Sequence, residues 1–157
     1  TSAGAGAPPV FETLPVGGTN TPAFFVKKST NQSCSHNTAT QVVYQTEVVD
    51  TDSAFASNTF TVPSGKNGVY FLFAQVRFES DAQWSYIINE IKVNNGTVFS
   101  GWNENVDYST VYVSGFVNLS VGDTVKHIVT QQSGGTLNIG YADRGAITYL
   151  GGHKIIT

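Results

Sequence analysis

Hydrophobic and polar residues alternate along much of the chain after Pro22, and this pattern predicts β-strands rather than helices. The alternation is clearest in Tyr108–Leu119, where Val111, Val113 and Leu119 fall on one face of the segment. Because successive side chains of a strand point to opposite sides, such a segment buries one face and leaves the other near water.

The segment Val69–Ser80 has a different pattern, because its first half is apolar on both faces. One face is apolar throughout, and the opposite face begins with Val69, Phe71 and Phe73 before it becomes polar. A strand of a sandwich needs only one buried face, so the second face must meet another surface. We expect a second copy of the chain there; coverage by a loop or by the N-terminal segment is the alternative.

Other segments that are rich in β-branched and aromatic residues are bounded by Gly, Asn, Asp and Ser turns, and Ser29–Thr40 reads as a polar loop. No segment has the pattern of an amphipathic helix longer than a turn or two. Eight to ten short strands with such turns predict an all-β, antiparallel, two-sheet sandwich or a barrel. The remaining predicted strands are Ala23–Lys28, Gln41–Asp50, Asn58–Pro63, Trp84–Val93, Thr97–Trp102, Thr124–Gln132, Thr136–Tyr141 and Ala146–Ile155.

Residues 1–22 differ from the rest, because they combine small residues, prolines and a few apolar side chains. This composition predicts an extended N-terminal arm, with the folded domain spanning residues 23–157. We expect the arm to anchor on a partner through Val10, Phe11, Leu14 and Val16; a disordered terminus is the alternative.

Composition excludes several classes of function. The 157 residues carry a net charge of −3 and no run of Lys or Arg, so we expect no nucleic-acid partner. No apolar stretch approaches the ~18 residues of a membrane span, so we expect no membrane insertion. Cys34 is the only cysteine, which rules out an intrachain disulfide and favours assembly in a reducing compartment. The first residues do not resemble a signal peptide.

Several motifs occur in the order in which they are found in one known family. They are Phe60–Pro63, Gly68–Phe73, Ile91–Gly96, Val117–Val125 and Leu150–Ile155, with Leu150 where an aromatic residue is usual. From residue 23 onward, the chain resembles the complement C1q / tumour-necrosis-factor jelly-roll family. The resemblance implies a ten-strand, two-sheet jelly roll that forms a homotrimer around aromatic and aliphatic residues of its inner sheet.

The chain has no Gly-X-Y repeat, although animal members of this family usually follow a collagen-like stalk. Similar domains occur on bacteriophage particles, so we expect a non-enzymatic virion structural protein that is assembled in the host cytoplasm. It would be a homotrimeric capsid decoration (cement) or head-fibre protein on the particle surface, anchored to the major capsid protein by its arm. The alternatives are a receptor- or glycan-binding head of a tail fibre and a secreted C1q-like recognition domain.

The sequence contains no catalytic motif, and its three histidines, His36, His127 and His153, lie in separate segments. His127 alternates with Val125 and Val129, so we expect it to point inward. Cys34 and His36 are too few for a zinc site, and the Asp50-x-Asp52 pair is expected to be a solvated turn rather than a calcium site. We therefore expect no enzyme activity, metal or cofactor.

Aromatic residues beside polar ones suggest a surface that binds a cell-surface glycan. The candidates are Trp84, Trp102 and Tyr108, with Trp102 in a predicted loop at Ser100–Asn105. Packing of both tryptophans at the edges of the sandwich is the alternative. Sequons at Asn31, Asn95 and Asn118 matter only in a eukaryotic secretory pathway.

Overall fold

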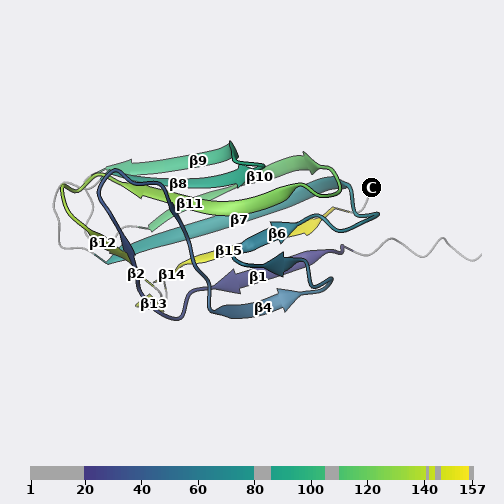
Figure 1. Cartoon of the computed structure of the whole chain (residues 1–157), viewed down its shortest axis with the longest axis horizontal. Helices are drawn as coiled ribbons and strands as arrows, with labels where there is room; N and C mark the ends of the chain where they lie inside the picture. Colours follow the sequence, from purple (N-terminus) through teal and green to yellow (C-terminus); the bar gives the residue numbers. More distant parts are fainter. Residues whose placement is uncertain (1–19, 80–85, 105–109, 141, 144–145, 156–157) are drawn as a thin grey trace, which may run out of the picture.

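The computed structural model describes residues 20–79, 86–104, 110–140, 142–143 and 146–155, and it is built from strands (Figure 1). A seven-stranded sheet, here the β7 sheet, has the order β2-β12-β7-β15-β1-β4, with β10 also paired to β7. Its strands are β1 (Ala23–Lys27), β2 (Gln32–Cys34), β4 (Thr46–Asp50), β7 (Gly68–Glu79), β10 (Thr110–Leu119), β12 (Leu137–Ile139) and β15 (Tyr149–Lys154).

A six-stranded sheet, here the β11 sheet, has the order β5-β6-β11-β8-β9, and β3 pairs with β11. Its strands are β3 (Thr40–Gln41), β5 (Phe55–Ala56), β6 (Thr59–Thr61), β8 (Tyr86–Val93), β9 (Gly96–Glu104) and β11 (Thr124–Gln131). A small hairpin pairs β13 (Ala142–Asp143) with β14 (Ala146–Ile147). All paired strands are antiparallel, as predicted for a two-sheet sandwich.

The core lies between the two sheets and comes from one face of each strand. In β7, Tyr70, Leu72 and Ala74 are fully buried, and Val125 and Val129 are buried on β11. Val111, Val113 and Leu119 of β10 point inward, which confirms the face predicted from their alternation. Burial of these side chains supplies the main stabilising contribution, at about 25 cal/mol per Å² of apolar surface.

A buried polar network links the two sheets through His127, which points inward as predicted. Its ring nitrogens bond the Tyr44 hydroxyl through Nδ1 and the Asn89 Oδ1 atom through Nε2. Asn89 Nδ2 in turn donates to the Val111 carbonyl on the β7 sheet at 2.8 Å. Burial, with a smaller contribution from the charge of Lys28, lowers the pKa of His127 to about 3. The imidazole is therefore neutral at physiological pH and acts as a structural link.

Three local predictions are wrong. The segment Ser29–Thr40 is not only loop, because Gln32–Cys34 forms β2 against β12. The predicted strand Gln41–Asp50 is broken at residues 42–45, where the chain passes from the β11 sheet to the β7 sheet. The predicted loop at Ser100–Asn105 is wrong, because β9 continues past the predicted strand end at Trp102 to Glu104. Long-range pairing overrides the local turn signals in the first and third cases, whereas in the second case the crossing between sheets interrupts a segment with a strand pattern.

β1 begins at Ala23, the first residue of the predicted domain. Residues 1–19 of the predicted arm, including Val10, Phe11, Leu14 and Val16, lie outside the described residues. None of the described segments forms a helix of the length and hydropathy that a membrane span needs.

Candidate interaction surface

The outward face of the β7 sheet carries a continuous group of aromatic side chains. Register places Phe25, Gly151, Phe73 and Ser114 in one row across the sheet. The neighbouring rows add rings on both sides. We call this group the aromatic face; it consists of Phe25 on β1, Tyr149 and His153 on β15, Phe71 and Phe73 on β7, and Tyr112 and Phe116 on β10.

Six of these seven side chains form a continuous series of ring contacts; they are Phe25, Phe71, Phe73, Phe116, Tyr149 and His153. Phe71 lies with its centroid 5.2 Å from Phe116, 5.9 Å from Phe73 and 5.9 Å from His153. Phe25 lies 5.6 Å from Tyr149, which is 6.0 Å from Phe73. These separations fall within the 4.5–7 Å range of favourable aromatic pairs. These six rings therefore form a single packed layer, and Tyr112 adds a further ring to the same face on β10.

Gly151 makes room for the centre of this layer. A Cβ atom at this position would lie 2.5 Å from Phe73 Cζ and 3.1 Å from the Phe24 carbonyl oxygen. The missing side chain lets the Phe73 ring lie over β15, next to Tyr149. The flat centre of the aromatic face thus depends on a glycine of the neighbouring strand.

Exposure increases from the centre of the face toward β10. Phe71, Phe73 and Tyr149 are half-buried, whereas Tyr112 is 50% exposed and Phe116 is 68% exposed. Burial raises the pKa of the Tyr149 hydroxyl, and the nearby Tyr112 adds to the shift. Exposed rings that lie together in this way are typical of a surface that binds another macromolecule.

A groove adjoins the aromatic face at the open edge of the sandwich. It has a volume of about 520 Å³ and lies between β9 and β10, lined by Phe99, Gly101, Tyr112 and Val113 among others. Each of these strands is the last of its sheet. Tyr112 therefore belongs to both surfaces, so the groove and the aromatic face are continuous.

The structure places Val69, Phe71 and Phe73 on the outward face of β7, as their alternation predicts. Their contact with another subunit stays a prediction. Five further residues of the same face, Phe25, Tyr112, Phe116, Tyr149 and His153, were not predicted as site residues. A signal existed in part, because Phe24 and Phe25 are adjacent and one of them must face outward.

The predicted glycan candidates are only partly described. Trp102 is 61% exposed on the outward face of the β11 sheet, so it does not pack within the sandwich. Its ring centroid lies 5.7 Å from that of Tyr86, a residue that the sequence did not single out. Trp84 and Tyr108 lie outside the described residues.

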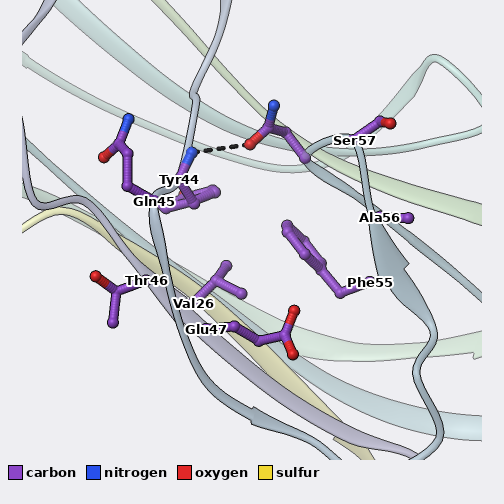
Figure 2. A pocket seen from close by; sticks show the side chains of 9 residues that line it. Val26, Tyr44, Gln45, Thr46, Glu47, Phe55, Ala56 and Ser57 are labelled. Atoms are coloured by element: carbon purple, nitrogen blue, oxygen red, sulfur yellow. Dashed lines mark hydrogen bonds between the residues drawn. The ribbon is translucent and has the colours of Figure 1, made fainter.

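A pocket of about 300 Å³ lies at the opposite edge of the sandwich, between the segment 42–47 and β5 (Figure 2). Val26, Tyr44 and Phe55 form its apolar part, and Glu47 points toward it. The backbone N–H of Tyr44 donates to Asn58 Oδ1 at 2.8 Å, which ties the two walls together. Glu47 is the only charged side chain among the residues that line this pocket.

The candidate catalytic and metal-binding groups have separate structural partners. Cys34 is buried and burial raises its pKa, whereas His36 is exposed and accepts the N–H of Gly134 at 3.0 Å. The Asp50 carboxylate accepts the N–H groups of Ala54 and Phe55, each at 2.9 Å, and closes a turn. No group of three or more metal-binding side chains occurs in the part of the chain that the structure describes.

Solved structures share this architecture. Murine APRIL at pH 8.5 has a TM-score of 0.60 and 18% identity, and the match covers 85% of this chain and 98% of that chain. The globular domain of the zebrafish complement 1qA protein has a TM-score of 0.55 and 18% identity, covering 85% of this chain and 97% of that chain. No family model matches the chain, and no curated protein does. The fold is a C1q/TNF-like, all-β jelly roll, as predicted.

Proposed function

We propose that the chain is a non-enzymatic assembly domain that forms a homotrimer through its aromatic face. The carrying observation is the contiguous layer around Phe71, whose outermost rings, Tyr112 and Phe116, stay largely exposed in one copy. A second copy would remove these rings from water, and each buried Phe contributes about 1.5–3 kcal/mol. The similarity in fold to C1q and TNF-family domains supports the trimer.

The open edge supplies a surface that is complementary to this face. In the proposed trimer, the β9–β10 edge of one copy packs on the aromatic face of the next copy. This contact joins two different surfaces of the same chain, so a threefold rotation can close it into a ring. Tyr112 lies in both surfaces, which makes the contact continuous around the axis.

We infer that this trimer is a structural protein of a virus particle, specifically a bacteriophage capsid decoration or head-fibre protein. In this proposal the arm, through Val10, Phe11, Leu14 and Val16, binds the major capsid protein at the particle surface. Three arms on one trimer bind with high effective concentration, so weak individual contacts are sufficient. The absence of any possible intrachain disulfide supports assembly in the host cytoplasm.

The position of one sequon argues against the alternative of a secreted recognition domain. Asn118, the acceptor of a sequon, is exposed and lies opposite Val69 in the register of β10 and β7. It is therefore on the same side of the sheet as Phe71. A glycan attached there in a secretory pathway would cover part of the aromatic face and oppose the trimer.

Two experiments test this proposal. Native mass spectrometry of the whole chain should give three times 16.8 kDa, and a monomer would contradict the trimer. Particles that lack the protein should bind the whole chain but not a version that starts at Thr19. Equal binding of both versions would show that the arm is not needed for binding to the particle, and it would leave the proposed trimer unaffected.

A separate observation favours the receptor-binding alternative: Trp102 is exposed on the outward face of the β11 sheet. It predicts that Trp102→Ala abolishes adsorption of the particle to cells while the trimer forms normally.

A further inference from the structure

The outward face of the β11 sheet carries an aromatic pair in an otherwise largely polar setting. Register aligns Trp102 with Ile88 and Thr130, and it aligns Glu104 with Tyr86 in the next row. All of these side chains point away from the core, because the residues between them on β8 and β11 are buried. The Trp102 and Tyr86 rings are tilted by 32° at 5.7 Å and form one shallow surface.

Hydrogen-bonding groups surround the pair. Ser100 and Glu104 flank Trp102 along β9, and both are exposed. Gln132 is exposed beside Tyr86, since its backbone N–H donates to the Tyr86 carbonyl at 2.9 Å. Polar groups around a flat ring suit a ligand that has an apolar face and hydroxyls at its rim.

We propose that the Trp102–Tyr86 pair, here the aromatic platform, binds the apolar face of an uncharged pyranose. Such a ring presents C–H groups to the indole and hydroxyls to the side chains at the edge. An aromatic residue with an apolar ring face and polar neighbours suits a contact that is apolar at its centre and hydrogen-bonded at its edge. The platform goes beyond the proposed trimer and does not depend on it, because it faces outward from the other sheet.

The size of the platform favours a sugar over a protein partner. A stable protein interface buries about 800 Å² on each side and uses roughly 20–30 residues. The platform offers two rings and Ile88, and side chains such as Ser100 and Thr130 interrupt further apolar surface. A single pyranose ring covers an area comparable to one or two aromatic side chains.

Charge selects among sugars. Glu104, opposite Tyr86 in the register, is acidic, whereas Glu90 is paired with Lys92 at 3.5 Å and Lys126 lies opposite Lys92. A sialylated or sulfated glycan stacked on the pair would bring negative charge toward the Glu104 carboxylate and would be repelled. The platform is therefore expected to prefer neutral hexose or N-acetylhexosamine units.

The test is a glycan array that holds neutral hexose and N-acetylhexosamine oligosaccharides beside sialylated and sulfated forms of the same backbones. The whole chain should bind at least one neutral glycan more strongly than its anionic forms. Trp102→Ala and Trp102→Leu should weaken this binding about tenfold, and Trp102→Tyr should retain most of it, because stacking needs a flat ring. Exposed Val121 gives a matched control, and Val121→Ala should leave binding unchanged.

Several results would overturn the proposal. One is the absence of binding to any neutral glycan. The others are binding that Trp102→Ala leaves unchanged and a preference for the sulfated glycans. Each variant is also measured for molar mass and for unfolding by urea. If Trp102→Ala dissociates the oligomer, Trp102 belongs to a subunit contact and the platform is not a sugar site. Failure of the platform with an intact trimer leaves the proposed assembly unaffected.

Discussion

The two sheets bury apolar faces against each other, but they present different faces outward. The β7 sheet exposes a packed layer of rings centred on Phe71 and Phe73, with Phe116 68% exposed. The β11 sheet exposes mainly polar side chains, with Trp102 and Tyr86 as an isolated pair. The inward alternation therefore determines the sandwich, whereas the outward residues determine what each sheet can bind.

The largest effect should come from a charge placed in the aromatic face. Phe116→Glu should dissociate the trimer, because burial of the exposed part of this ring (68%) in three copies is worth about 3–6 kcal/mol and a buried carboxylate adds a further cost. The single domain should keep its fold, since Phe116 is already largely exposed in one copy. Sedimentation velocity measures the shift from trimer to monomer.

Val121→Glu provides the control, because Val121 is 51% exposed in a turn away from the aromatic face. It should sediment as the parent chain does. Dissociation of both variants would mean that added charge alone, and not the aromatic face, controls assembly.

The buried hydrogen-bond network around His127 should make the free energy of unfolding decrease at acid pH. The pKa of His127 is about 3 in the folded chain, compared with an ordinary value of 6.5. Below pH 6.5, His127 becomes protonated in the unfolded chain but stays neutral in the folded chain. The free energy of unfolding should therefore fall by about 1.4 kcal/mol per pH unit until pH approaches 3, and this contribution is fully present above pH 6.5.

Urea unfolding between pH 7 and 4 measures this slope. His127→Leu should be less stable overall, because it leaves the Tyr44 hydroxyl and Asn89 without their partner. Its free energy of unfolding should fall less steeply with acid than that of the parent chain. Identical slopes would show that His127 does not control the acid response.

A smaller effect is expected at the centre of the aromatic face. Gly151→Ala would place a Cβ atom 2.5 Å from Phe73 Cζ, so the ring must move. Overpacking of this kind costs about 1–3 kcal/mol and should also weaken the trimer. Gly135→Ala is the matched control, because its Cβ would meet nothing within 4 Å. Urea midpoints that are lowered equally by both substitutions would contradict this account of Gly151.

The smallest effect should come from the other sheet. Trp102→Ala removes a side chain that is 61% exposed, so the free energy of unfolding should change by no more than about 0.5 kcal/mol. The trimer should persist. A large loss of stability, or dissociation of the trimer, would contradict the claim that the aromatic face supports assembly and the face around Trp102 does not.

Local patterns could predict a large part of the fold. The alternation in β10 and the two-sided apolar start of β7 identify the inward residues and place Phe71 and Phe73 outward. The remaining rings of the aromatic face could not be predicted, because they depend on register. Phe25 and Tyr149 reach Phe73 only when β1, β15 and β7 pair, and these strands are far apart in the sequence.

The wrong prediction for Trp102 has a clear physical origin. Gly101 falls within the predicted loop Ser100–Asn105, but it lies in β9, where a Cβ would come within 2.7 Å of Val113 Cγ1. The glycine thus permits a close approach between the two sheets rather than a turn. Only the three-dimensional packing reveals this role, and with it the outward orientation of Trp102.

The most direct test of the central claim is the solution molar mass of the whole chain, measured by light scattering over a range of dilutions. We expect a mass near three times 16.8 kDa that persists to low concentration. A mass of 16.8 kDa at every concentration would contradict the claim that the aromatic face is covered by other copies of the chain.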